Sequence, residues 1–210
     1  MIGCLKSILK KLLMIALIFA FFAFGGYAFV KEKIKQYKYP PREVFVETEK
    51  DFADFKNVSG DYQLHRCFNL FGYKKIIAKY LPTEQKIAIY DLKNEDIITT
   101  SDFRTSEINE KIDVVLKKFQ NSIVTYDNFK IVEKGEYGAK NKNIPYVKFS
   151  ANVRNVPFKE VVGTIAAYST ANKKQQISTK LIVLIVDNKA YNPKIMKDFI
   201  ESLEFELGNE

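Results

Sequence analysis

The feature that most constrains this chain is an uncharged apolar run near its N-terminus, Leu12–Val30. A helix of that length, at about 1.5 Å per residue, reaches across the roughly 30 Å hydrocarbon core of a bilayer. Lysines stand on both sides of the run, and Tyr27 lies near its far end, where aromatic side chains favour the membrane–water boundary. The run therefore predicts one transmembrane anchor.

A cleaved secretory signal peptide is the alternative interpretation of the same residues. Basic residues precede the run, and the small Gly26 and Ala28 suit a cleavage site after Ala28. Tyr27, Phe29 and Val30 argue against cleavage because they keep the chain apolar up to and beyond that site. We therefore expect the segment to remain attached.

The net charge of +8 is concentrated beside this run. Residues 1–11 carry three lysines, and residues 31–42 carry five basic side chains against one glutamate. From Glu43 onward, 25 basic side chains are nearly balanced by 24 acidic ones. This distribution suits contact with anionic lipid headgroups, whereas a nucleic-acid binder carries its excess charge on the folded domain. We expect no nucleic-acid partner.

Changes in composition divide the chain into four parts. These are a basic tail over residues 1–11, the anchor over 12–30, a basic stalk over 31–42, and one globular domain over 43–210. A short basic tail favours the cytoplasm, while the basic stalk favours the opposite orientation. Because long domains cross a membrane largely regardless of charge, we expect the domain outside the cytoplasm. Cys4 and Cys67 then lie on different sides, so no disulfide is expected.

Apolar periodicity locates the elements of the domain. A stripe at i, i+4, i+7, i+8 and i+11 predicts a helix over Ser106–Gln120, and Asn192 followed by Pro193 predicts the start of a second helix. A continuous apolar run within Thr179–Val186 suits a central strand. The other expected strands are Tyr62–Leu70, Lys74–Tyr80, Gln85–Leu92, Phe129–Tyr137, Ile144–Val153 and Phe158–Tyr168. Strands at hairpin spacing and two amphipathic helices predict an α+β fold, with helices packed on an antiparallel sheet.

The order of elements over residues 102–207 resembles the PsbP-like domain, named for an extrinsic photosystem protein and found also in bacterial lipoproteins. The similar stretches are Asn128–Gly135, Ile144-Pro145-Tyr146 and Tyr191–Phe205. The resemblance covers about half of the chain and rests on spacing rather than on a diagnostic motif. It implies an α-β-α sandwich, here preceded by one transmembrane helix, and a non-enzymatic accessory or binding role near a membrane. It assigns no functional residue.

His65 and Cys67 are the pair that most suggests a metal site or a thiol nucleophile. Two residues apart on a strand they share a face, and their nitrogen and sulfur suit zinc or copper. A structural site needs about four ligands, and a separation of roughly 7 Å is loose for a catalytic pair. We interpret the pair as a half-buried histidine beside a small apolar cysteine, and assign no metal ligand.

Acidic residues around a polar loop are the other candidates for chemistry. Asp91, Glu95, Asp96 and Asp102 surround this loop, next to Arg104. Paired acids can perform general acid–base catalysis, but loops are commonly charged because they are solvated. The sequence therefore assigns no catalytic residue and no cofactor-binding residue.

Together these patterns predict a single-pass membrane protein whose domain is a non-enzymatic accessory or binding module. Its expected partners are the lipid bilayer, through residues 12–30 and the flanking lysines, and a protein of the cell envelope. A carrier for a hydrophobic ligand such as a lipid is the alternative, because aromatic residues are abundant in a chain held at a membrane. That role requires an apolar pocket. An enzyme is the third hypothesis, and it requires polar side chains that converge in a cleft.

Overall fold

The computed structural model describes residues 26–38, 41–70, 73–91, 98–119, 125–154, 159–171 and 177–205. The chain divides into two units, Met1–Pro41 and Arg42–Glu210. In the first unit the described residues form helix α2, Gly26–Lys38. Most of the expected anchor, residues 12–25, lies outside the described residues. None of the helices described here combines the length and apolarity needed to cross a bilayer.

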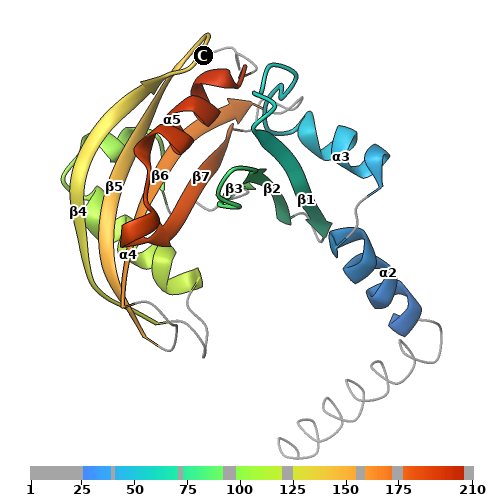
Figure 1. Ribbon diagram of the computed structural model, residues 1–210, viewed down its shortest axis with the longest axis horizontal. Coiled ribbons are helices and arrows are strands. Elements are labelled where there is room, and N and C mark those ends of the chain that lie inside the picture. Colours follow the sequence, from blue (N-terminus) through green and yellow to red (C-terminus); the bar gives the residue numbers. More distant parts are fainter. Residues whose placement is uncertain are drawn as a thin grey trace, which may run out of the picture. The chain divides into compact units, whose positions relative to one another are not determined.

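The second unit is built on one antiparallel sheet, whose seven strands follow the order β1-β2-β3-β7-β6-β5-β4 (Figure 1). Alternating apolar residues form these strands because successive side chains point to opposite faces. The strands are β1 (Tyr62–Leu70), β2 (Tyr73–Tyr80), β3 (Lys86–Asp91), β4 (Thr125–Gly138), β5 (Asn143–Arg154), β6 (Glu160–Ala171) and β7 (Ile177–Asp187).

Two antiparallel meanders, β1–β3 and β4–β7, join edge to edge in this sheet. The last strand lies in the middle, where β7 pairs with β3 on one side and with β6 on the other. The register places Ile87 opposite Leu184 and Asp91 opposite Lys180. Residues far apart in the sequence therefore meet at the β3–β7 seam.

Short helices pack on both faces of the sheet. They are α3 (Arg42–Glu49), the 3-10 helix η1 (Ser101–Arg104), α4 (Ile108–Phe119), the 3-10 helix η2 (Asn188–Ala190) and α5 (Pro193–Ser202). Helix α5 begins where its sequence predicts, because the Asn192 side chain accepts a hydrogen bond from the Lys194 N–H and Pro193 occupies the first turn. Figure 1 shows α5 in front of the sheet and α4 behind it.

Two buried clusters fill the spaces on the two sides. The α5 face carries residues such as Ile76, Ile89 and Ile182, which pack with Phe199 of α5 and with Phe52 from the segment after α3. The α4 face carries Val147, Phe149, Ile165 and Leu181, which pack with Ile108 and Ile112 of α4. The neighbours Leu181 and Ile182 lie on different faces, so β7 is buried on both sides.

The predicted fold class is wrong. The second unit is mostly one wide antiparallel sheet with few short helices, not an α-β-α sandwich, and no transmembrane helix precedes it within the described residues. An apolar stripe shows where a helix packs, but not how much of a sheet it covers. Here Phe52, Phe55 and Phe205, which lie outside helices, cover part of the α5 face. Each expected strand overlaps an observed one, and the two expected helices correspond to α4 and α5.

Candidate functional site

A row of polar side chains crosses the α5 face through four neighbouring strands. Lys74 on β2 is opposite Asp91 on β3, Asp91 is opposite Lys180 on β7, and Lys180 is opposite Tyr168 on β6. Each of these residues continues the alternation of an apolar strand, as Lys180 does two residues before Ile182. The side chains therefore point into the same layer as the buried isoleucines.

The centre of the row is a buried ion pair. The Lys180 Nζ lies 2.6 Å from the Asp91 Oδ2, and the two side chains are only 4% and 8% exposed. The Ser178 hydroxyl donates a hydrogen bond of 2.5 Å to the Asp91 Oδ1, and the Lys180 Nζ lies 3.2 Å from the Ser178 Oγ. Phe52 covers the amine, with its ring centroid 5.4 Å from the Lys180 Nζ. Both oxygens of this carboxylate are therefore engaged inside the protein.

A second ion pair continues the row toward the surface. The Lys74 Nζ lies 2.5 Å from the Asp51 Oδ2, with the side chains 23% and 38% exposed. At the other end, the fully buried Tyr168 donates a hydrogen bond of 3.0 Å from its hydroxyl to the Phe52 carbonyl oxygen. Burial, with a smaller contribution from the charge of Asp91, raises the pKa of Tyr168 well above its usual range. Tyr168 is therefore a neutral donor that fixes the Phe52 backbone above the row.

Two opposing effects act on the pKa of Lys180 at the centre of the row. Burial lowers the pKa of Lys180, and the hydrogen bond and negative charge of Asp91 oppose this, but the net shift is downward. Removing charges from water is costly, so the two buried groups depend on each other and on Ser178 for stabilisation. The pair thus places a nitrogen nucleophile beside a carboxyl group, with a hydroxyl donor on the other carboxyl oxygen.

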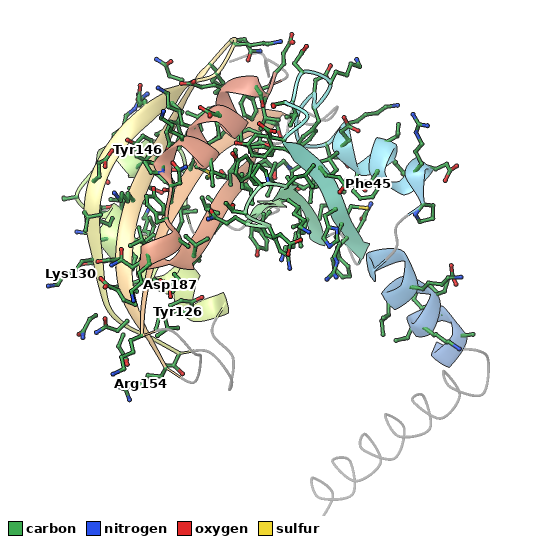
Figure 2. All side chains as sticks on the ribbon, viewed as in Figure 1. Phe45, Tyr126, Lys130, Tyr146, Arg154 and Asp187 are labelled. Carbon is green, nitrogen blue, oxygen red and sulfur yellow. The ribbon has the colours of Figure 1, made fainter. Side chains whose placement is uncertain are left out.

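A tyrosine cluster occupies the same face nearer to β4. The rings of Tyr137 and Tyr146 stack with centroids 4.1 Å apart, and Tyr146, labelled in Figure 2, packs against the core of the α5 face. The Tyr146 hydroxyl donates to Glu133. Burial and this hydrogen bond raise the pKa of Tyr146 to about 12. Gly135, opposite Tyr146 in the ladder, leaves room for the ring, because a Cβ there would lie 2.8 Å from it. We interpret the cluster as packing.

The suggested pair on β1 does not form a site. The register of β1 shifts between Leu64 and Arg66, which places His65 at an irregularity of the strand. Cys67 is buried, and burial raises the pKa of its thiol, which disfavours the reactive thiolate. Within the part of the chain that the structure describes, no three His, Cys, Asp or Glu side chains are grouped to hold a metal ion.

The acidic residues around the polar loop are separated by the sheet. Asp91 lies in the row on the α5 face, whereas Asp102 binds the Lys111 Nζ at 2.7 Å beside the core of the α4 face. Arg104 pairs with Glu136 at 2.9 Å. Glu95 and Asp96 lie outside the described residues. The described acids therefore do not converge.

Two hollows on the described surface are shallow and open to solvent. One, of about 230 Å³, lies over Phe103 and Pro145 and is bordered by Arg104, Lys134 and Glu136. The other, of about 390 Å³, follows the outer side of α3. It is lined by Arg42, Glu43, Val46, Glu47 and Lys50. Both are open depressions of the surface rather than enclosed cavities.

Sequence reasoning did not single out Lys180 or Ser178. The sequence did indicate a buried lysine, because Lys180 shares a face with Ile182 and Leu184 at the start of the apolar run of β7. A lysine at such a position needs a buried partner. That partner, Asp91, is brought beside it only by the pairing of β3 with β7.

Comparison with known proteins finds no family model and no curated protein that matches this chain, so the resemblance to PsbP-like domains stays a prediction.

Proposed function

We propose that this chain is a membrane-attached, non-enzymatic binding module, held at the bilayer by Leu12–Val30 and its flanking lysines. The observation that carries the proposal is helix α2, which continues from the end of the apolar run into the basic stalk. Its Phe29, Val30 and Ile34 are 47%, 41% and 51% exposed, and the exposed Lys31 and Lys35 lie among them. Apolar side chains interspersed with lysines suit the boundary between lipid and anionic headgroups.

The burial of the polar row is consistent with the non-enzymatic part of the proposal. At the centre of the polar row, Asp91, Lys180 and Ser178 direct their hydrogen bonds at one another beneath Phe52. The charged atoms are therefore committed to partners within the protein, and an external substrate has no access to them in this arrangement. The hollows described above are open to solvent and enclose no ligand-sized apolar space, so they add no support for a carrier of a hydrophobic ligand.

The test of membrane attachment is flotation of the full chain with lipid vesicles. One variant reverses the stalk charge by changing Lys31, Lys33, Lys35 and Lys38 to Glu. Each lysine near an anionic surface contributes roughly 1 kcal/mol, so we expect binding to phosphatidylglycerol vesicles to weaken by at least about ten-fold. Binding to neutral phosphatidylcholine vesicles should change little, because the apolar run is intact.

A matched control changes four exposed lysines of the folded unit, Lys86, Lys130, Lys159 and Lys189, to Glu. This control alters the net charge equally and should float like the unmodified chain. A chain that lacks residues 12–30 should stay with the soluble fraction. Flotation of that shortened chain at the original level would refute attachment through the apolar run.

The side of the membrane that the folded unit occupies is a second part of the proposal. The short basic tail supports an extracytoplasmic unit. A reporter active in only one compartment, fused after Glu210, measures this directly. Activity on the cytoplasmic side would reverse the assignment and direct the search for a protein partner to the cytoplasm.

A further inference from the structure

We infer that Lys180 and Asp91 react with each other to form an intramolecular isopeptide bond, an amide between the Lys180 Nζ and the Asp91 Cγ that cross-links β7 to β3. In the structure the two groups form an ion pair. This is a covalent modification within the folded unit and does not depend on the proposed membrane attachment.

The strands hold the reacting groups together. The Lys180 Nζ lies 2.6 Å from the Asp91 Oδ2, one bond away from the carbon that it attacks. The residues are direct register partners in the β3–β7 ladder, with paired residues on both strands extending to Ile87 and Leu184. Folding has therefore already restricted the motion of both groups, which is the main entropic cost of joining two reactants.

Burial makes proton transfer from the ammonium to the carboxylate less costly than it is in water. The Lys180 and Asp91 side chains are almost fully buried, and the next residues on the same face, Ile89 and Ile182, are completely buried. Phe52 lies over the amine. The net lowering of the Lys180 pKa by burial points the same way. An amine beside a carboxylic acid is the state from which an amide forms.

The proposed step balances without any external reagent. A proton moves from the Lys180 ammonium to the Asp91 Oδ2, which leaves an amine and a carboxylic acid. The nitrogen lone pair then forms a bond to Cγ, and negative charge develops on Oδ1, where the Ser178 hydroxyl already donates a hydrogen bond. The Cγ–Oδ2 bond breaks, and Oδ2 leaves as water with a second proton from the nitrogen. An ion pair becomes an amide and one water, with no oxidation or reduction.

The chain contains internal controls. Lys74 and Asp51 are as close, at 2.5 Å, but their side chains are 23% and 38% exposed. Lys111 and Asp102 lie 2.7 Å apart, with the lysine side chain 33% exposed. Water stabilises the ammonium at both of these pairs, and hydrogen bonds from Lys111 and Thr99 stabilise the Asp102 carboxylate, so we expect neither pair to form an amide.

The test is the mass of the full-length protein after denaturation, measured when freshly purified and again after days at neutral pH. We expect a mass lower by one water. Trypsin does not cleave after an acylated lysine, so the digest should contain a branched peptide that joins Ile87–Lys93 to Gln175–Lys189. Fragment ions should place the junction between Asp91 and Lys180.

Two variants separate the reaction from other losses of water. Lys180→Arg keeps a positive charge beside Asp91 but offers no comparable nucleophile, so it should keep the full mass. Ser178→Ala removes the donor to Oδ1 and should slow bond formation on the order of 10²-fold, measured as the linked fraction over time.

Several results would overturn the inference. A full mass at both times, with ordinary cleavage after Lys180, shows that the pair remains ionic. A cross-link found at Lys74 or Lys111 would show that burial does not determine which lysine reacts. A water loss that persists in Lys180→Arg assigns the reaction to other residues.

Discussion

Replacing Gly163 by alanine should destabilise the folded unit through a steric conflict between three strands. Gly163 on β6 lies opposite Phe149 on β5, and a Cβ at this position would come within 2.6 Å of two atoms of the Phe149 ring. It would also lie 2.9 Å from the Leu184 carbonyl oxygen on β7. Ordinary carbon contacts lie at about 3.5–4.0 Å, so the new methyl group lacks roughly 1 Å of space.

Neither neighbour can move away easily. Phe149 is completely buried and packs against Phe129 with ring centroids 5.2 Å apart, and the Leu184 oxygen belongs to the backbone of a central strand. Overpacking of a core typically costs about 1–3 kcal/mol, and we expect Gly163→Ala to fall in the upper half of that range. For a unit of this size the melting temperature should fall by roughly 4–12 °C. Circular dichroism during heating and urea titration measure both quantities.

Gly60→Ala is the matched control, because no atom lies within 4 Å of a Cβ there. It should be neutral, or stabilising by up to about 1 kcal/mol, since alanine reduces the freedom of the unfolded chain. The double variant Gly163→Ala/Phe149→Leu should lose less stability than the sum of its single changes. Equal stability of Gly163→Ala and Gly60→Ala would contradict the steric argument.

Two other substitutions test the polar contacts. Tyr168→Phe leaves the buried Phe52 carbonyl without its donor and should cost about 1–3 kcal/mol in urea unfolding, whereas an unchanged midpoint would show that this hydrogen bond contributes nothing. Burial tends to raise the pKa of Asp102, but hydrogen bonds from Lys111 and Thr99 lower it below its usual value of 3.8. The stabilisation from this depressed pKa is present at neutral pH and is lost as the pH falls through the folded pKa. The stability difference between the unmodified chain and Lys111→Met should therefore shrink between pH 7 and pH 3, and a constant difference would show that the pair is not ionic.

Local patterns in the sequence were sufficient to locate most elements of the second unit. Alternation identified strands such as β5, and the Asn192-Pro193 pair marked the start of α5. The eight-residue helix α3 was missed because a helix this short contains barely two turns of periodicity. The fold class was wrong for a different reason, since the extent of helical cover depends on how loop residues such as Phe52 pack.

The polar row could be predicted only in part. The position of Lys180 in an apolar alternation indicates a buried lysine, and Asp91 similarly ends the alternation of Ile87 and Ile89. Their pairing depends on the contact between β3 and β7, which no local pattern encodes. His65 shows a limit of spacing alone, because it lies at a shift in strand register, where the regular alternation of faces is interrupted.

The central position of β7 also determines when the sheet can be completed during synthesis. Strand β3 leaves the ribosome roughly 90 residues before its partner, a delay of about 5–20 s at ordinary rates of translation. Throughout that interval one edge of β3 has unpaired backbone groups beside Ile87 and Ile89, which is the type of segment that pairs with other chains. The nascent chain therefore cannot form its sheet progressively from the N-terminus, and β3 is the segment that a chaperone would have to protect until β7 emerges.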